Sequence, residues 1–270
     1  MSTVLRSDAL ADRVVLVTGG GTGIGRATAL ACAAAGADVA LCGRRTEALE
    51  EVAGEIDALG RRSLALAADV REPEQVSALV DAVLDAFGHV DVLVNNAGGQ
   101  FMAAAEELTV NGFRAVHRLS VEAVWSVTRE VAVRTMIPRR SGLVVFMAFS
   151  PRRGIPGMVH ATSARAAVEN LASGLALEWS RYGIRSVAVA PGTIHTEGLD
   201  EQYSPEDVAG WTGAVPLGRL GTPAEVGDVI AFLATPAAAY ITGTTLVVDG
   251  GVDAWGTGRS APSAAPVPGP

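Results

Sequence analysis

Two stretches of this chain carry residue types and spacings suited to chemistry. Residues 18–25 read Thr-Gly-Gly-Gly-Thr-Gly-Ile-Gly. Glycines at this spacing let the backbone approach a pyrophosphate, and a helix that opens there points its N–H groups at the phosphate oxygens. Much later, residues 160–165 read His-Ala-Thr-Ser-Ala-Arg, which places an imidazole near a guanidinium. The first stretch predicts a dinucleotide site lined by Gly19, Thr22, Gly23, Ile24 and Gly25.

The end of the second predicted strand indicates which dinucleotide binds. A carboxylate there would bind the ribose 2′-hydroxyl of NAD, but the chain has Gly43 followed by Arg44 and Arg45. An arginine fork matches the charge and geometry of a 2′-phosphate, which favours NADP(H). We expect Arg44 to bind the phosphate and Arg45 to be more exposed. In the alternative interpretation, one arginine caps the next helix or is simply solvated.

Three other strand ends carry further candidates for cofactor binding. The Asp69 carboxylate can accept a hydrogen bond from the adenine amino group. Ile194 backbone groups can hold the nicotinamide carboxamide, and Thr196 can reach the pyrophosphate. The full set at these strand ends is Asp69, Val70, Asn96, Ala97, Gly98, Pro191, Gly192, Ile194 and Thr196.

The elements that must position these residues alternate along the chain. Continuous apolar runs, typical of strands with both faces covered, occur at Val14–Thr18, Asp38–Cys42, Ser63–Ala67, Val90–Val94, Leu143–Met147, Ser186–Ala190 and Thr245–Val248. Amphipathic stretches between them predict helices at 23–36, 45–59, 73–87, 110–137, 160–182 and 223–234. This order predicts an α/β fold: one Rossmann-type, doubly wound parallel sheet of about seven strands, flanked by helices, with ligand at the carboxyl ends of the strands.

Composition limits the classes of protein to which this chain can belong. The chain has 270 residues, 49% of them hydrophobic, which suits one domain over 1–255; the Gly, Ser, Ala and Pro of 256–270 predict a disordered tail. A net charge of −8 argues against a nucleic-acid partner. The four histidines and two cysteines have no metal-ligand spacing, so we expect no metal site. With no signal-peptide or membrane-spanning pattern, we expect a cytoplasmic protein.

The motifs together resemble those of the short-chain dehydrogenase/reductase family. The matching stretches are TGGGTGIG (18–25), DV (69–70), NNAG (95–98), PG (191–192) and TGTTLVVDGG (242–251). NNAGGQF (95–101), HATSARAAVENL (160–171) and LALEWSRYGIR (175–185) are similar to peroxisomal trans-2-enoyl-CoA reductases and their bacterial relatives. That resemblance implies NADPH-dependent reduction of a C=C bond conjugated to a thioester. It also implies a homodimer or homotetramer, with a dimer interface on the two long helices.

The catalytic group that the family implies is missing. The family uses asparagine, serine, tyrosine and lysine, and its motifs place these four on Ser120, on Ala148 or Phe149, on Ala161 and on Arg165. If the loop over 149–160 is one residue shorter than in the family, the tyrosine position falls on His160 or Thr162 instead, and neither is a tyrosine. Arg165 keeps the charge of the lysine and can hydrogen-bond the nicotinamide ribose, but it releases no proton near neutrality. Carbonyl reduction needs a proton as hydride arrives. Conjugate reduction leaves an enolate that a nearby cation can stabilise, so the loss of tyrosine favours C=C reduction.

Several polar and aromatic residues remain as candidates for the chemistry. Arg165, His160 and Ser120 are the candidate catalytic residues; His160 would donate to a carbonyl or enolate oxygen, and its alternative role is packing or capping of its helix. The candidate substrate-pocket residues are Gln100, Phe101, Phe149, Ser150 and His160. Each of them has an alternative structural role in loop bracing, local hydrogen bonding or core packing.

Three functions remain open at this point. The first is an NADPH-dependent reductase of an enoyl thioester or enone. The second is a carbonyl reductase with a relocated acid such as His160. The third is reuse of the fold for a non-redox reaction or for a cofactor-binding partner role.

Overall fold

The computed structural model describes residues 5–196, 198–199 and 204–255. Within them, seven parallel strands form one sheet in the order β3-β2-β1-β4-β5-β6-β7. The strands are β1 (Val14–Thr18), β2 (Asp38–Gly43), β3 (Ser63–Ala67), β4 (Val92–Asn95), β5 (Gly142–Met147), β6 (Ile184–Pro191) and β7 (Thr245–Val248). The predicted fold class is therefore confirmed, and the chain reverses direction of winding between β1 and β4, where ligands bind in such sheets.

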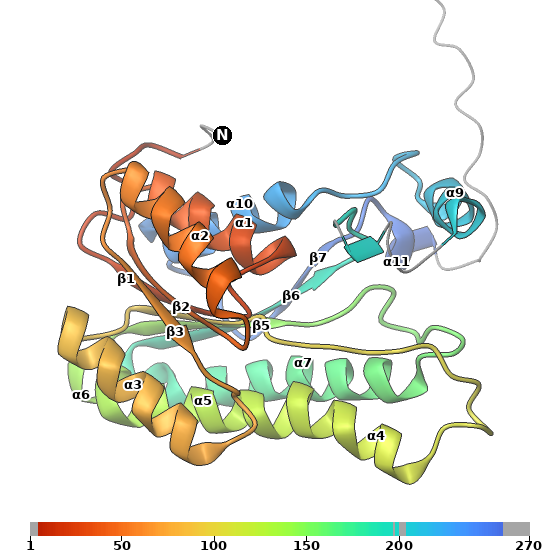
Figure 1. Ribbon diagram of the computed structural model, residues 1–270, viewed down its shortest axis with the longest axis horizontal. Coiled ribbons are helices and arrows are strands. Elements are labelled where there is room, and N and C mark those ends of the chain that lie inside the picture. The colour runs from red at the N-terminus through yellow and green to blue at the C-terminus, as the bar shows by residue number, and fades with distance from the viewer. Residues whose placement is uncertain (1–4, 197, 200–203, 256–270) are drawn as a thin grey trace, which may run out of the picture.

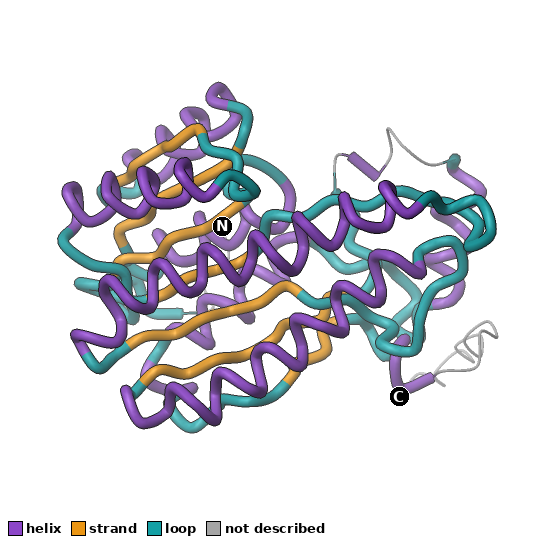
Figure 2. Tube along the Cα trace, turned by 90° about the horizontal axis from the view of Figure 1, so that it is seen from below, coloured by secondary structure: helices purple, strands orange, loops and turns teal. Residues whose placement is uncertain are grey.

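Helices cover both faces of the sheet (Figures 1 and 2). One layer holds α1 (Gly23–Ala34), α2 (Thr46–Ala58) and α10 (Pro223–Ala234), which pack on side chains such as Val15 and Val17. The other layer holds α3 (Pro73–Phe87), α5 (Ala123–Val131) and α7 (Val159–Trp179), which pack on the opposite face through side chains such as Leu16 and Leu93. Two apolar cores therefore fix the sheet between them and hold its strand ends in register.

The predicted helix over 110–137 is wrong in one respect, because it is not continuous. The chain forms α4 (Val110–His117), a π-helical stretch at Arg118–Glu122, α5, a second π-helical stretch at Ala132–Met136, and α6 (Ile137–Arg139). Each π turn inserts a residue and rotates the helix beyond it. The first π stretch holds Ser120, which is buried at 2% exposure. The local rotation therefore sets the direction of one candidate side chain.

Two short helices were not predicted from the sequence. They are α9 (Pro205–Ala214), which begins with a capping box between Ser204 and Asp207, and α11 (Val252–Trp255). Figure 1 places both beside the carboxyl ends of β6 and β7, at the end of the molecule where α4 and α7 project beyond the sheet. The predicted tail at 256–270 lies outside the described residues.

Candidate active site

The glycine-rich loop has the backbone geometry that a pyrophosphate needs. Gly19 and Gly23 have positive φ angles of 66° and 54°, which favour glycine. A Cβ at Gly25 would lie 2.1 Å from the carbonyl oxygen of Gly19, so a side chain there would collide with the backbone. The Asn96 side-chain amide donates to the carbonyl oxygens of Thr18 and Gly19 at 3.0 and 3.1 Å. Asn96 thus braces the loop from the neighbouring strand β4.

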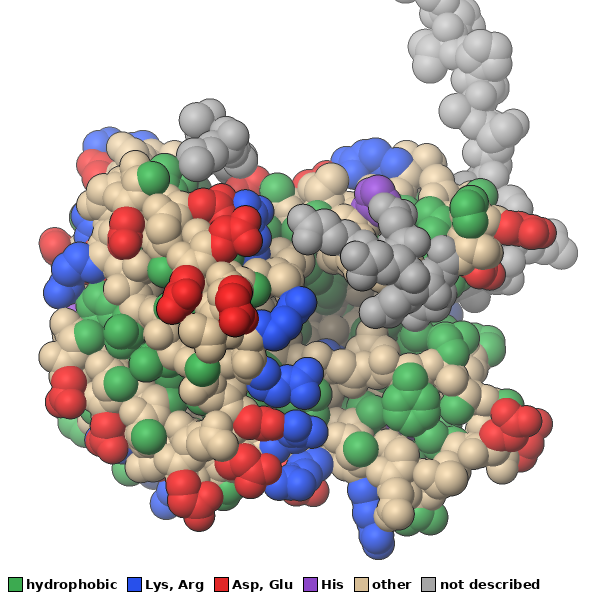
Figure 3. All heavy atoms as spheres, in the orientation of Figure 1, with side chains coloured by type: hydrophobic (Ala, Val, Ile, Leu, Met, Phe, Trp, Pro, Cys, Tyr) green, Lys and Arg blue, Asp and Glu red, His purple; other side chains and the backbone are tan. Residues whose placement is uncertain are grey.

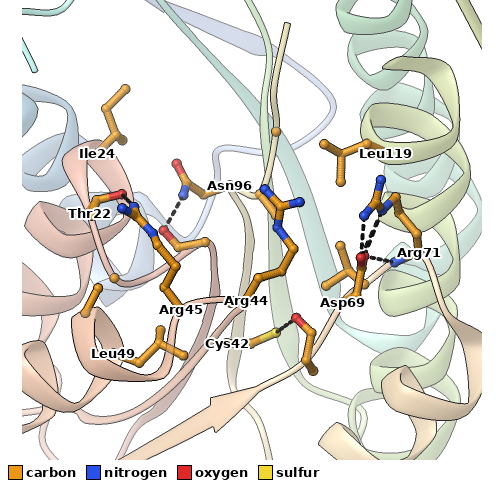
Figure 4. Close-up of a pocket in the computed structure, with 18 of the residues that line it drawn as sticks. Thr22, Ile24, Cys42, Arg44, Arg45, Leu49, Asp69, Arg71, Asn96 and Leu119 are labelled. Carbon is orange, nitrogen blue, oxygen red and sulfur yellow. Dashed lines mark hydrogen bonds and ion pairs between the residues drawn. The ribbon is translucent and has the colours of Figure 1, made fainter. Parts of the chain in front are cut away.

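A pocket of about 470 Å³ lies beside this loop (Figure 4). It is lined by residues from the ends of four strands, β1 to β4, and from the segment that follows β6. The predicted cofactor residues that line it are Gly19, Thr22, Ile24, Arg44, Arg45, Asp69, Val70, Asn96, Ala97, Gly98 and Thr196. Figure 3 shows basic side chains bordering a hollow on this side of the molecule. The residues present fit a dinucleotide: a cradle free of side chains, a helix N-terminus and cations at one end.

The two arginines after β2 are placed differently within this pocket. Arg45 donates to the Thr22 hydroxyl at 3.2 Å, across the pocket from its own helix α2. Arg44 extends into the space between Arg45 and Asp69 (Figure 4). Its guanidinium has no hydrogen bond to any other described side chain, so its donors stay available to a phosphate. Both side chains are exposed, so the expected contrast in their exposure is not seen.

Asp69 is held by an arginine that the sequence motifs did not single out. Arg71 donates to both carboxylate oxygens of Asp69 at distances between 2.5 and 3.1 Å. The Arg71 hydrogen bonds lower the pKa of Asp69 to about 2. Arg71 and Leu119 also line the pocket. Arg71 had a sequence signal, since it lies two residues after Asp69, whereas Leu119 had none because only the π turn brings it to the pocket.

Arg165 is the most unusual charged group of the site. It lies on α7 with 8% of its surface exposed, and its Nη1 donates to the carbonyl oxygen of Met147 at 2.6 Å. Its other Nη nitrogen lies against Gly98, where a Cβ would come within 2.2 Å of it. Burial lowers the pKa of the guanidinium to about 10, so it stays charged at neutral pH. No carboxylate among the described residues pairs with it.

His160 lies on the same helix and is completely buried, at 0% exposure. Neither of its ring nitrogens has a hydrogen-bond partner among the described residues. The ring of Phe101 lies 4.5 Å from the His160 ring, centroid to centroid. Phe101 belongs to the loop after β4 and is 44% exposed, so the imidazole contacts a ring that solvent reaches. Phe149 packs with Ala161 and Met158 nearby, whereas Gln100 is exposed on the same loop as Phe101.

Several predicted residues do not line the dinucleotide pocket. Among the cofactor candidates these are Gly23, Gly25, Arg165, Pro191, Gly192 and Ile194, and Ser150 is also outside it. Pro191 and Gly192 pair with neighbouring strands through their backbone, and Ile194 lines a second pocket of about 580 Å³ on the β7 side. The Ser150 hydroxyl donates to Asp249 and is turned toward the C-terminal segment. The sequence did not reveal this partnership, because Ser150 follows β5 and Asp249 follows β7, far apart in the chain.

Three further properties of the described residues concern metal ligands, membrane spans and cysteines. No group of three or more possible metal ligands occurs among the histidine, cysteine and acidic side chains that the structure describes. Among the same residues, no helix is both long and apolar enough to span a bilayer. Both cysteines, Cys32 and Cys42, are free and buried, and burial raises the pKa of each thiol to about 12.

A doubly wound sheet with a glycine cradle at its switch point defines a dinucleotide-binding protein of the Rossmann type. A family model described as enoyl-(acyl carrier protein) reductase matches residues 19–253. The chain therefore belongs to the short-chain dehydrogenase/reductase family, an oxidoreductase family, as the sequence motifs predicted.

Individual relatives agree with this assignment. A probable 2,4-dienoyl-CoA reductase [(2E)-enoyl-CoA-producing] of Bacillus subtilis is 38% identical over 88% of this chain and 96% of its own length. A peroxisomal 2,4-dienoyl-CoA reductase [(3E)-enoyl-CoA-producing] of Danio rerio is 37% identical over 92% of this chain and 83% of its own. Among solved structures, a citronellol catabolism dehydrogenase of Pseudomonas aeruginosa superposes with a TM-score of 0.83 at 38% identity, covering 94% of this chain and 100% of that one.

Proposed function

We propose that this enzyme uses NADP(H) to reduce a C=C bond conjugated to the carbonyl of an acyl thioester, with a 2,4-dienoyl-CoA or trans-2-enoyl-CoA as substrate. The observation that carries the proposal is the buried guanidinium of Arg165, which has no carboxylate partner among the described residues. A desolvated cation of this kind is costly unless a negative charge arrives beside it. The enolate formed by conjugate reduction is such a charge.

The cofactor half of the proposal rests on the pocket after β1 and β2. The loop at Gly19–Gly25 would hold the pyrophosphate, and Arg44 would hold the 2′-phosphate that distinguishes NADP(H) from NAD(H). Asp69, oriented by Arg71, would accept from the adenine amino group. When bound, NADPH supplies a hydride to the substrate.

The chemistry half depends on what the chain's own residues can do. Addition of a hydride to the far carbon of the conjugated system moves an electron pair onto the carbonyl oxygen. Arg165 stabilises that oxyanion by charge and by its remaining N–H donors. The proton then reaches carbon in a separate step and can come from water. Arg165 itself supplies none, because its pKa of about 10 keeps it protonated.

A ketone substrate is a poorer fit to these residues. The alkoxide that forms on ketone reduction needs a proton during hydride transfer, and the position expected to supply it holds Ala161. The family's serine position, Ala148 or Phe149, carries no hydroxyl either, and the nearby Ser150 hydroxyl is occupied by Asp249. Two relatives support the same choice by their names, a probable 2,4-dienoyl-CoA reductase of Bacillus subtilis and a peroxisomal 2,4-dienoyl-CoA reductase of Danio rerio. A 3-oxoacyl-[acyl-carrier-protein] reductase of Synechocystis is 38% identical, so the assay below includes a 3-oxoacyl thioester.

The experiment that tests the proposal is a single-turnover assay with bound NADPH. Dissociation constants for NADPH and NADH are first measured by fluorescence titration. The NADPH complex is then mixed with a 2,4-dienoyl-CoA, a trans-2-enoyl-CoA, an enone and a 3-oxoacyl thioester. Fast oxidation by one or both of the conjugated thioesters is expected. Tight NADPH binding with no oxidation by any of the four substrates overturns the proposal, whereas oxidation by the 3-oxoacyl thioester alone would identify a carbonyl reductase.

The product of a dienoyl substrate gives a second, independent readout. Hydride addition at C5 leaves a dienolate that can take its proton at C2 or at C4, which gives the (3E)- or the (2E)-enoyl thioester respectively. Both products occur in the names of the relatives. Product analysis by NMR in deuterated water locates the added deuterium. If water is the proton source, the (3E)-enoyl thioester with deuterium at C2 should predominate, because the α-carbon of a dienolate takes a proton faster than the γ-carbon. A predominant (2E) product would instead require an acid positioned at C4.

We also infer a homo-oligomer held by α5 and α7. Trp125 on α5 and Trp179 on α7 have stacked rings 6.4 Å apart, and Trp125 is 41% exposed. Leu177, on the same helix as Trp179, is 84% exposed. Exposed side chains of this size favour burial against a second copy. Light scattering at micromolar concentration tests this inference; a monomer would contradict it.

A further inference from the structure

The His160 side chain is an unusual group for the interior of a protein. Its exposure is 0%, yet neither Nδ1 nor Nε2 has a hydrogen-bond partner among the described residues. Buried polar groups nearly always have one, because leaving them unpaired costs the free energy of their lost hydration. The neighbouring His117 illustrates the usual outcome, since its Nε2 lies 3.0 Å from the Ser163 hydroxyl oxygen. Both ring nitrogens of His160 therefore lack the hydrogen-bond partner that buried polar groups nearly always have.

The residues around His160 belong to loops at the end of the sheet where ligands bind in this architecture. His160 lies in the first turn of α7, five residues before Arg165 in the chain. The loop after β4 supplies the cofactor-pocket residue Gly98 and, three residues later, Phe101, whose ring covers the imidazole. The loop after β5 supplies Phe149, which packs with Met158 and Ala161. Both loops start at carboxyl ends of central strands, where ligands bind in this architecture.

The side of His160 next to Phe101 is formed by side chains that solvent reaches. Phe101 is 44% exposed and the next residue, Met102, is 52% exposed, so a large part of each side chain contacts solvent rather than protein. A backbone hydrogen bond of 2.9 Å from Ala103 to Gly157 ties this loop to the one after β5. The planes of the Phe101 and His160 rings are tilted by 38° at a centroid distance of 4.5 Å. This distance lies within the range of direct contacts between aromatic rings.

We propose that Phe101 covers His160 in the free enzyme, and that a conjugated acyl substrate takes its place. The conjugated acyl group then lies beside the imidazole with its carbonyl oxygen near the plane of the ring, where a His160 N–H donates a hydrogen bond to it. This inference rests on the proposed function for the identity of the substrate. His160 thereby orients the substrate for Arg165, and the site prefers planar acyl groups over saturated ones.

Two substitutions separate recognition from packing. H160F fills the same space without polar atoms, and H160Q keeps an N–H donor on a side chain of similar reach. For H160F we expect a higher Tm without ligand, because the unpaired nitrogens are gone, and an unchanged Kd for NADPH. We expect kcat/KM for a dienoyl-CoA to fall about tenfold or more, with partial recovery in H160Q. An H160F enzyme with unchanged kcat/KM overturns the proposal.

A binding measurement keeps the test independent of turnover and of folding. Wild-type enzyme labelled with ¹⁵N-histidine is titrated with a trans-2-enoyl-CoA in the presence of NADP⁺, which cannot deliver hydride. The His160 ring signals, assigned with H160Q, should shift as the substrate saturates the site, and the His89 signals serve as an internal control. Unmoved His160 signals in a saturated complex overturn the proposal. A shift in an enzyme that fails to oxidise NADPH with these thioesters would contradict the proposed function while supporting this recognition.

The cover itself is tested by chemical modification in the absence of substrate. Diethylpyrocarbonate modifies exposed histidine rings, and mass spectrometry of the peptide reports His160 alone. F101A should make His160 react several-fold faster than in the wild type, while M102A, which shortens the exposed neighbour, serves as the matched control. Equal reactivity of His160 in F101A and the wild type would show that Phe101 is not its cover and would overturn that part of the proposal.

Discussion

The guanidinium of Arg165 reaches from α7 to the carbonyl oxygen of Met147 at the end of β5, at 2.6 Å. This contact fixes a buried cation at the carboxyl edge of the sheet, next to Gly98 on the neighbouring strand end. A lysine at this position could exchange a proton with a tyrosine, but an arginine with no tyrosine beside it supplies only charge and hydrogen bonds. An anion beside this guanidinium would offset the cost of burying its charge.

Replacing Arg165 by methionine should separate stability from catalysis. The methionine removes an unpaired buried charge, so Tm should be unchanged or higher. The single-turnover rate with a dienoyl-CoA should fall by about 10²-fold or more, since the oxyanion loses its main support. Stopped-flow NADPH oxidation and calorimetry measure the two effects. A lower Tm together with an unchanged rate would show that Arg165 is structural.

The titration of Arg165 also predicts a pH dependence with a definite sign. Burial lowers its pKa to about 10 on folding, so at pH values above about 10 the folded protein binds fewer protons than the unfolded one. Burial of this cation therefore opposes folding fully below the folded pKa, and this penalty is relieved as pH rises through about 10. Across neutral pH the group contributes no slope to Tm or rate. The Tm difference between wild type and R165M, measured from neutral pH to above pH 10, isolates this contribution. The difference should be constant across neutral pH and should shift in favour of the wild type as pH rises through about 10.

Arg44 should set the preference for NADPH over NADH. In R44A the Kd for NADPH should rise about 10- to 100-fold, which corresponds to the loss of a charged hydrogen bond, while the Kd for NADH should change little. R45A is the matched control and should have a smaller effect, because Arg45 already donates to Thr22. Fluorescence titration of both nucleotides gives all four constants. An equal loss of affinity for NADPH and NADH in R44A would refute a phosphate-specific role.

The glycine cradle should not tolerate a single methyl group. In G25A the new Cβ would meet the Gly19 carbonyl oxygen, so the loop must shift and NADPH binding should be lost. G54A is the control, since no atom lies within 4 Å of a Cβ at that position in α2 and alanine favours a helix by about 1 kcal/mol. We expect G54A to bind NADPH normally with an equal or higher Tm. Normal NADPH affinity in G25A would contradict the assignment of the loop.

The Asp69–Arg71 pair should stabilise the protein only while Asp69 is ionised. Its hydrogen bonds to Arg71 lower the Asp69 pKa from 3.8 to about 2 in the folded state. The contribution is therefore present above the unfolded pKa and is lost as pH falls through the folded one. R71A should lower stability by less than about 1 kcal/mol at neutral pH, because the pair is partly exposed, and by less again near the folded pKa. Denaturant titrations of both proteins at the two pH values check this; an equal difference at both would contradict it.

The order of the elements and most of the residues that line the pocket beside the glycine loop could be predicted from the amino-acid sequence. The apolar run at Val14–Thr18 forms a strand over the predicted bounds, because a strand buried on both faces must be continuously apolar. The glycines of the first loop were recognisable because each serves a local backbone requirement. Such features depend on neighbours in the chain, so a single sequence reveals them.

The use of the remaining polar groups depends on tertiary packing. In the folded chain Ser150 pairs with Asp249, Asp69 with Arg71 and the carbonyl of Met147 with Arg165, while His160 has no partner among the described residues beneath Phe101. Leu119 lies in the first π-helical stretch and lines the pocket, and the sequence did not indicate that the helix departs from regular geometry there. Partnerships between distant residues depend on packing and rotation in three dimensions, and local sequence patterns carry little information about either.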